Sequence, residues 1–183
     1  IILLSPGYLT WMQIEGLGWN WVGKILAILF SLIFYYKFKP HLGQELYVNL
    51  NPQKQYLKSN IIILILISAI AMVEGILFYN QNWDIETLLF QLTLPGIDEE
   101  IAYRGIILGF FSSCMLKKIS FGKVVIHNPS IWIVGVLFGL IHALQFDIQW
   151  KLTFNLFYFI KTFILGTIWG YMTIKSRSIL LPI

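Results

Sequence analysis

The chain has 183 residues, of which 57% are hydrophobic and only 12% are charged. Soluble domains carry about a quarter charged residues, so this composition excludes an ordinary soluble domain and indicates a polytopic membrane protein. The net charge of +4 does not call for nucleic acid, because excess lysine in a membrane protein marks cytoplasmic loops. The single cysteine, Cys114, excludes an intramolecular disulfide and a cysteine metal cluster.

Apolar runs of membrane-spanning length recur along the chain. A helix needs about 20 apolar residues to cross a hydrocarbon core of about 30 Å. Such runs cover roughly residues 17–36, 61–79, 87–111, 130–146 and 153–174, and residues 178–183 have the pattern of a sixth run that is only begun. We therefore predict a single-domain (1–183), all-α bundle of at least five transmembrane helices, and we expect the sequence to be part of a longer product.

The charges between these runs predict an orientation. If the first run starts outside, the first, third and fifth connections are cytoplasmic. They hold Lys37, Lys39, Lys54, Lys58, Lys117, Lys118, Lys123, Lys175 and Arg177. The loops on the other side hold Lys151 together with Asp84, Glu86 and Asp147. This asymmetry follows the positive-inside rule.

The third run contains a cluster of charges in Asp98-Glu99-Glu100-Ile-Ala-Tyr-Arg104-Gly. Ionisable groups at bilayer depth cost a few kcal/mol each on insertion scales. They are therefore expected to pair with one another, to line a wet cavity or to perform chemistry. On a helix, Glu100 and Arg104 are i and i+4 neighbours and can face each other. A structural pair would account for these two residues but not for Glu99, which is rotated by about 100° and is the candidate for acid–base chemistry.

A histidine in the fourth run is the expected counterpart of these carboxylates. At about 1.5 Å per residue, Glu99 lies roughly 18 Å from one end of its run, and His142 lies roughly 18 Å from the opposite side. Both are near mid-depth and can meet. Phe138 shares the face of His142, and the pair Gly135-x-x-x-Gly139 is expected to let this helix approach the third run closely.

Further polar residues lie within the spans. Lys24, near the start of the first run, is expected to snorkel to the membrane surface. Asp98 follows Pro95-Gly96 and is interpreted as a kink or cavity residue. Glu74 in the second run is a candidate partner of Arg104 or His142, or of Lys161 in the fifth run.

The motif Glu99-Glu100-x-x-x-Arg104, followed by Phe138-x-x-x-His142, resembles the signature of the CPBP family of intramembrane proteases. This family comprises CAAX proteases, including type II prenyl endopeptidases, and bacteriocin-processing (Abi) proteins. The resemblance covers residues 87–183 as a catalytic core. The third family motif, a histidine with asparagine often four residues later, is expected after Ile183, beyond Ser178-Ile-Leu-Leu-Pro-Ile. Tyr103 stands where the family usually has phenylalanine.

The resemblance implies a role for each matched residue. Glu99 would activate a water molecule with help from His142, Glu100 would hold the site, and Arg104 would orient the carboxylates or bind substrate. Phe138 would line the substrate cavity, and the expected histidine and asparagine would stabilise the oxyanion. A divalent metal such as zinc remains open. If one is present, Glu99, Glu100 and His142 would be its ligands, although a water activated by glutamate needs no metal.

The resemblance predicts a peptide hydrolase of a bacterial plasma membrane that acts on a membrane-associated peptide or a lipid-modified protein. The lipid bilayer is then its surroundings, and no nucleic acid is involved. Two alternatives stay open. One is a non-catalytic membrane protein that acts in bacteriocin immunity or as a scaffold. The other is a proton-coupled transporter in which the same charged residues form a relay, although no inverted repeat is visible in the sequence.

Overall fold

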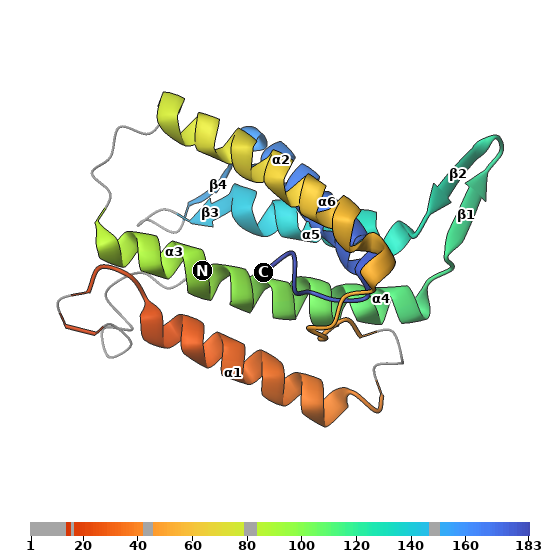
Figure 1. Ribbon diagram of the computed structural model, residues 1–183, viewed down its shortest axis with the longest axis horizontal. Coiled ribbons are helices and arrows are strands. Elements are labelled where there is room, and N and C mark those ends of the chain that lie inside the picture. Colours follow the sequence, from red (N-terminus) through yellow and green to blue (C-terminus); the bar gives the residue numbers. More distant parts are fainter. Residues whose placement is uncertain (1–13, 16, 42–45, 79–83, 147–150) are drawn as a thin grey trace.

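The computed structural model describes residues 14–15, 17–41, 46–78, 84–146 and 151–183 (Figure 1). Its long helices follow the predicted order: α1 (Trp21–Phe38), α2 (Lys54–Phe78), α3 (Ile85–Glu99), which continues through the π-helix η2 (Glu100–Ile107) into α4 (Leu108–Cys114), then α5 (Pro129–Ala143) and α6 (Leu156–Ser176). The mostly helical fold is confirmed. Three of these helices, α1, α2 and α6, are long and apolar enough to cross a membrane.

Two small antiparallel hairpins interrupt the predicted all-α fold. Strands β1 (Lys118–Phe121) and β2 (Val124–His127) pair between α4 and α5, where the sequence predicted only a basic loop. Strands β3 (Leu144–Phe146) and β4 (Leu152–Phe154) pair between α5 and α6. The predicted fourth span was therefore too long at its end, because residues 144–146 leave the helix and pair with β4.

Other helix boundaries also differ from the predicted ones. The side chain of Asn20 caps α1 by accepting a hydrogen bond of 2.8 Å from the Gly23 amide, so α1 begins later than expected. The helix α2 begins before its apolar run and includes Lys54 and Lys58. After α6, Arg177 adopts a left-handed conformation (φ 54°), which ends the helix. The segment 178–183 is a turn, where the sequence had indicated the start of a sixth span.

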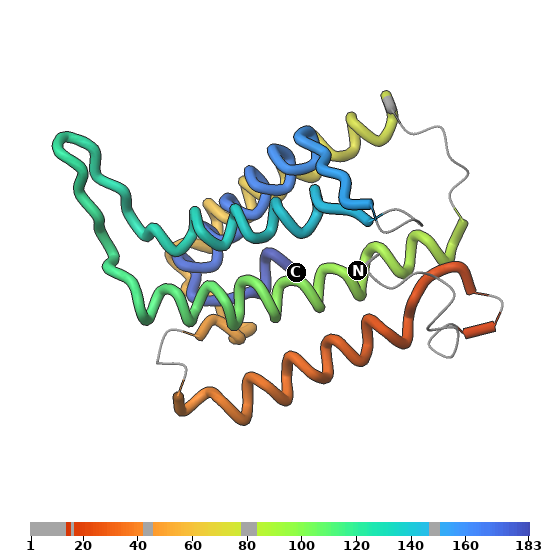
Figure 2. The backbone as a smooth tube through the Cα atoms, turned by 180° about the vertical axis from the view of Figure 1, so that it is seen from behind, coloured from red at the N-terminus to blue at the C-terminus, as the bar shows by residue number. Residues whose placement is uncertain are grey.

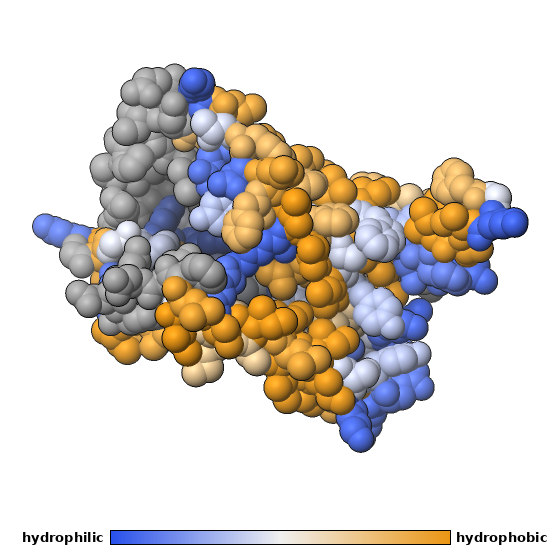
Figure 3. All heavy atoms as spheres, turned by 90° about the horizontal axis from the view of Figure 1, so that it is seen from above, coloured by the Kyte–Doolittle hydropathy of each residue, from blue (hydrophilic) through white to orange (hydrophobic). Residues whose placement is uncertain are grey.

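Two views show how the helices are arranged (Figures 1 and 2). The rod of α3, η2 and α4 runs through the middle, with α1 along one side and the α5–α6 pair along the other. The helix α2 packs on α6. Because α2 is mostly unburied within the protein and strongly apolar, its outer surface is suited to lipid. The hydrophobic exterior is evident in Figure 3.

The two glycine pairs of α5 and α6 face each other. A Cβ on Gly135 or Gly139 would meet Thr167, Phe163 or Phe159 of α6, and a Cβ on Gly166 would meet Phe138 of α5. The prediction that Gly135 and Gly139 help α5 approach the third span was therefore wrong. These glycines let α5 and α6 pack closely, and this contact fixes the position of His142 indirectly.

Candidate active site

The charged cluster lies where the central rod changes from α-helix to π-helix. The Leu108 amide donates to the Tyr103 carbonyl, five residues back, so one turn of the rod is wider than an α-helical turn. Such π-helical turns are rare and occur frequently at functional sites. Here the wide turn, Glu100–Ile107, contains Arg104 and begins directly after Glu99. The sequence did not reveal it.

Glu100 and Arg104 form the predicted i,i+4 pair. Arg104 Nη1 lies 3.0 Å from Glu100 Oε1, and both side chains are almost fully buried. The guanidinium of Arg104 lies over the ring of Phe138, 4.0 Å from its centroid. The ring of Phe138 also contacts those of Tyr103 and His142. Phe138 is therefore a buried support of the charged cluster, and it lies outside the cavity that the sequence expected it to line.

Glu99 points away from this pair and faces His142. Glu99 Oε2 lies 3.7 Å from His142 Nε2, and both side chains are partly exposed, at 26% and 33%. The two residues meet, as the sequence predicted, although His142 lies in the last turn of α5 and not in the middle of its helix. His142 Nδ1 lies 2.8 Å from the Phe138 carbonyl oxygen. Because a carbonyl can only accept, Nδ1 carries the hydrogen, and Nε2 is the ring nitrogen directed at Glu99.

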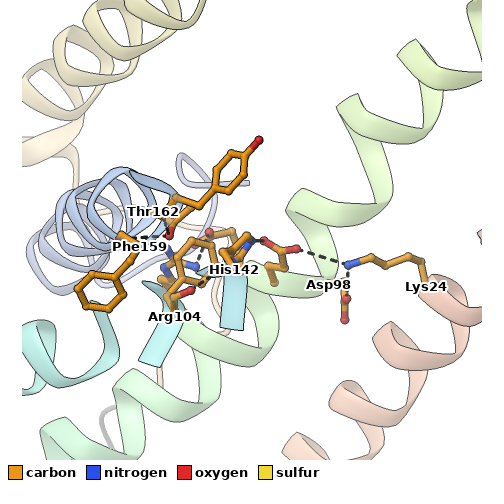
Figure 4. Close-up of polar contacts among 10 residues, drawn as sticks. Lys24, Asp98, Arg104, His142, Phe159 and Thr162 are labelled. Atoms are coloured by element: carbon orange, nitrogen blue, oxygen red, sulfur yellow. Dashed lines mark hydrogen bonds and ion pairs between the residues drawn. The ribbon is translucent and has the colours of Figure 1, made fainter. Parts of the chain in front are cut away.

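A lysine that the sequence placed at the membrane surface lies inside the site instead. Lys24 Nζ is 2.8 Å from Asp98 Oδ2 and 3.5 Å from Glu99 Oε1. Its side chain is only 7% exposed, so the prediction that Lys24 snorkels was wrong. Figure 4 shows Lys24 reaching from α1 to the central helix, opposite the side from which His142 approaches. Asp98 is therefore an ion-pair partner of Lys24 as well as a residue of the cavity wall.

The sequence alone did not reveal Lys24 as a site residue, because Lys24 is far along the chain from the residues that it contacts. Its partners are 74 and 75 residues away, and the only available signal was a lysine in the first turn of an apolar helix. Snorkelling is the usual explanation of such a lysine. The position of α1 beside α3 is fixed by Glu86, which accepts hydrogen bonds from the Trp19 amide and from the Trp21 indole.

Glu99, Asp98, Lys24 and His142 all line one cavity of about 670 Å³. Its wall is mostly apolar, and its other lining residues come from the segment just before α1 and from α3, η2, α5, β3 and α6; among them are Trp19, Phe90, Pro95, Tyr103, Phe146 and Thr162. Viewed from above, hydrophilic residues lie in a hollow of the surface, next to hydrophobic ones (Figure 3). This combination of an apolar wall with a few convergent polar groups is typical of a ligand site.

The proposed metal ligands do not converge in the described part of the chain. The Glu100 carboxylate is turned to Arg104, so only Glu99 and His142 of the expected set face a common point. Among residues 14–15, 17–41, 46–78, 84–146 and 151–183, no three His, Cys, Asp or Glu side chains are grouped as a metal site. Structural and catalytic zinc sites use at least three protein ligands, so these residues alone do not fit zinc.

Glu74 is not part of the site. Its carboxylate pairs with Lys161 of α6, which was one of the partners that the sequence suggested. Both side chains are about a third exposed, and neither lines the cavity around Glu99.

Residues 178–183 pack next to the site. The Ile183 carbonyl oxygen lies so close to α3 that a Cβ on Gly96 would be 3.0 Å from it. Gly96 is three residues before Glu99, so Ile183 lies less than one helical turn from the carboxylates. Ser178 and Ile179 are fully buried, and the Ile179 amide donates to the Asn49 carbonyl.

Comparison with known proteins identifies one family. No curated protein and no solved structure matches the chain. Residues 81–183, more than half of the chain, match the family described as type II CAAX prenyl endopeptidase Rce1-like. This match includes Glu99, Glu100, Arg104, Phe138 and His142, and it begins after α1 and α2. The chain therefore belongs to the Rce1-like family of type II CAAX prenyl endopeptidases, which are membrane-embedded proteases.

Proposed function

We propose that this protein is an intramembrane endopeptidase in which Glu99 activates a water molecule that attacks a peptide carbonyl. The observation that carries the proposal is the pair formed by Glu99 Oε2 and His142 Nε2, 3.7 Å apart at the wall of a cavity of about 670 Å³. Among the described residues, neither of these two atoms forms another structural contact. Their arrangement suits a water molecule better than a direct hydrogen bond.

The geometry allows one water to bind both groups. A water oxygen can lie about 2.8 Å from each atom, donating one hydrogen to Glu99 and the other to His142. The His142 tautomer permits this, since Nδ1 donates to the Phe138 carbonyl and leaves the Nε2 lone pair to accept. Both water hydrogens are then engaged, and the oxygen lone pairs face the cavity, where a substrate carbonyl would lie.

Hydrolysis follows with a balanced transfer of protons. As the water oxygen bonds to the carbonyl carbon, Glu99 takes one water proton and the carbonyl oxygen becomes an oxyanion. When the C–N bond breaks, Glu99 returns that proton to the leaving nitrogen. Acid–base assistance of this kind contributes typically about 100-fold to 10,000-fold in rate. No described donor is assigned to the oxyanion.

Glu100, Arg104 and Phe138 act as positioning residues in this proposal. The Arg104 guanidinium is completely buried and lies between Glu100 and the Phe138 ring. It therefore holds the start of the π-helical turn against α5. Because Phe138 also contacts the His142 ring and supplies the carbonyl that fixes its tautomer, this arrangement links the two halves of the site.

The substrate class follows from the family and from the cavity wall. A prenylated C-terminal peptide offers a lipid chain and a peptide bond together, and a largely apolar cavity that ends at Glu99 and His142 suits both. The same proposal places the central rod and α5 in the membrane with the three apolar helices, giving five spans with the lysine-rich end in the cytoplasm. A bacterial plasma membrane and a role in bacteriocin processing remain predictions.

The test is cleavage of a fluorescent peptide that ends in a prenylated cysteine and three further residues, by the full-length protein in proteoliposomes. Wild type is expected to release the C-terminal fragment, and Glu99→Gln or His142→Gln is expected to reduce kcat by about 100-fold or more. In ¹⁸O-labelled water, the new carboxylate should carry one labelled oxygen. The same peptide without the prenyl group is the specificity control.

Two results would contradict the proposal. One is full activity of Glu99→Gln, which would exclude Glu99 as the base. The other is a wild-type protein that folds in the membrane and cleaves neither peptide, which would favour a scaffold or immunity role. Adding a strong chelator tests the metal question separately, since loss of activity that zinc restores would require ligands beyond Glu99 and His142.

A further inference from the structure

We infer that Lys24 is a positioning residue for Glu99, so that α1 belongs to the active site although it lies outside the matched residues 81–183. This inference rests on the proposed function and deepens it. Lys24 approaches from the side opposite to His142 (Figure 4). It lies 3.5 Å from Glu99 Oε1, whereas His142 lies 3.7 Å from Glu99 Oε2.

The two oxygens of the Glu99 carboxylate contact residues of two different helices. Lys24 on α1 faces one oxygen, and His142 on α5 faces the other. A carboxylate held in this way cannot turn freely about its last bond, so Oε2 stays directed at the place where the water would bind. Displacement of a reacting group by about 1 Å can cost about 100-fold in rate, so the orientation of this oxygen matters for catalysis.

Asp98 explains how Lys24 can remain in this position. Lys24 and Asp98 are buried, and their 2.8 Å contact is the shorter of the two lysine contacts. A buried ammonium needs a close counter-charge, and Asp98 supplies it. The longer contact with Glu99 leaves that carboxylate partly exposed to the cavity and available to a water molecule. Asp98 thus anchors the lysine, and the lysine orients the base.

Lys24 also supplies a positive charge beside the base, 3.5 Å from Glu99 Oε1. The charged groups that face Glu99 are Lys24 from α1 and His142 from α5. Its own helix adds Asp98, which pairs with Lys24, and the Glu100–Arg104 pair, from which Glu99 points away. Arg104 is turned to Glu100, which leaves Lys24 as the permanent positive charge nearest to Glu99 among the described residues.

The experiment compares Lys24→Met, Lys24→Arg and Lys161→Met in the full-length protein. Lys161 provides the matched control, because it also forms an interhelical pair with a glutamate but lies outside the cavity. We expect Lys24→Met to lower kcat for the prenylated peptide by about 10-fold to 100-fold, with KM changed less than about threefold. Lys24→Arg should restore most of kcat, and Lys161→Met should leave both constants near wild type.

A second readout does not depend on peptidase activity. Dicyclohexylcarbodiimide modifies protonated carboxyl groups in apolar surroundings, and mass spectrometry locates the adduct. Lys24→Met should increase labelling of Asp98 and Glu99 at least about threefold, and Lys24→Arg and Lys161→Met should not. If Lys24→Met fails to accumulate, Lys24→Gln replaces it, because its amide can still donate to Asp98.

The outcomes separate the two proposals. Cleavage by wild type but unchanged kcat and labelling in Lys24→Met would overturn the role of Lys24 and leave the peptidase intact. Absence of cleavage by wild type, with increased labelling in Lys24→Met, would overturn the peptidase and retain Lys24 as the positive neighbour of Asp98 and Glu99. Loss of kcat that Lys24→Arg does not restore would also overturn the inference, since the charge would not be the cause.

A second, independent observation concerns the β1–β2 hairpin, which projects from the bundle (Figures 1 and 2). Its register pairs Ile119 with Ile126 and Phe121 with Val124, and because strand side chains alternate, these four apolar residues share one face. Phe121 and Val124 at the tip are 66% and 61% exposed. The opposite face carries Lys118, Ser120, Val125 and His127, and Lys123 lies in the turn.

We propose that the apolar face of this hairpin lies on an anionic lipid surface. The hairpin connects two helices at the lysine-rich end of the bundle, so a bilayer around those helices places it near the headgroups. Lys118 lies on the opposite face and Lys123 in the turn at the tip, and their long side chains can reach negatively charged headgroups at the edges of the hairpin. An amphipathic element with lysine on its polar side is the usual design for interfacial binding. In Figure 3, hydrophobic and hydrophilic residues separate across this part of the molecule.

Nitroxide labels on single cysteines test this proposal in a Cys114→Ser background. In vesicles containing phosphatidylglycerol, labels at 119, 121, 124 and 126 should collide with oxygen, and labels at 118, 120, 125 and 127 should collide with a water-soluble nickel chelate. The double variant Lys118→Glu/Lys123→Glu should reduce this alternation. Equal access of the chelate to both faces would overturn the proposal. Spin–spin broadening from a second copy would also overturn it, because protein would then cover the face.

Discussion

Two interhelical lysine–carboxylate contacts use the same chemistry in different surroundings. Lys24 joins α1 to Asp98 and Glu99 of the central helix, and Lys161 joins α6 to Glu74 of α2. The first lysine side chain is 7% exposed and borders the cavity with His142, whereas the second is 37% exposed and away from it. Ionisable residues in a membrane segment are candidate functional groups, and in our proposal the cavity, rather than the charge, distinguishes a functional contact from a contact that only packs helices.

The largest stability effect is expected from the buried charges of the central region. Arg104→Met leaves the Glu100 carboxylate buried without its partner, and breaking a buried pair in this way typically costs about 3–5 kcal/mol. The free energy of unfolding in mixed micelles, measured by titration with a denaturing detergent, checks this. The double variant Glu100→Leu/Arg104→Met is the control. It should be more stable than Arg104→Met, because it removes the uncompensated charge, and equal stabilities would contradict the account.

A smaller effect on stability is expected at Gly105, which lies in the central rod. A Cβ on Gly105 would lie 2.6 Å from Val48 Cγ2, and Gly105 also accepts a hydrogen bond from the Tyr47 amide. Gly105→Ala should therefore cost about 1–3 kcal/mol, measured by the same unfolding titration.

Gly75, the neighbour of Glu74 in α2, provides the matched control. Apart from its own helix backbone and its chain neighbours, no atom lies within 4 Å of a Cβ added there. Gly75→Ala should be neutral or stabilise by up to about 1 kcal/mol, since alanine favours helix. Similar losses at both glycines would show that the two regions are packed alike, contrary to the comparison.

The smallest effect on stability is expected at the pair of Lys161 and Glu74. Lys161→Met removes a partly exposed contact, and polar contacts between membrane helices are worth about 0.6 kcal/mol on average. The unfolding free energy should therefore fall by less than about 1 kcal/mol. A loss as large as that of Arg104→Met would mean that α2 depends on this pair for its attachment to the bundle.

Much of the fold and part of the site could be predicted from the sequence. Long apolar runs give the helices and their order, and counting residues along two runs brings Glu99 and His142 to the same depth. Glu100 and Arg104 are neighbours four residues apart on one helix, so their pairing is a local property. Each of these predictions depends on helix geometry within one segment.

The remaining features depend on contacts between segments. Lys24 meets Asp98 only because α1 packs beside α3, and Gly135 and Gly139 face α6 because that helix carries a complementary pair of glycines. Residues 144–146 are apolar and can continue a helix or form a strand; pairing with β4 decides between them. The π-helical turn follows from neither composition nor spacing.

The most direct test compares the two glutamates in one cleavage assay with the prenylated peptide in proteoliposomes. Glu99→Gln and Glu74→Gln each remove a carboxylate that faces a lysine from another helix. We expect Glu99→Gln to lower kcat by about 100-fold or more and Glu74→Gln to stay within about twofold of wild type. Equal losses of activity in the two variants, or no loss in Glu99→Gln, would contradict the claim that Glu99 in the cavity performs the chemistry.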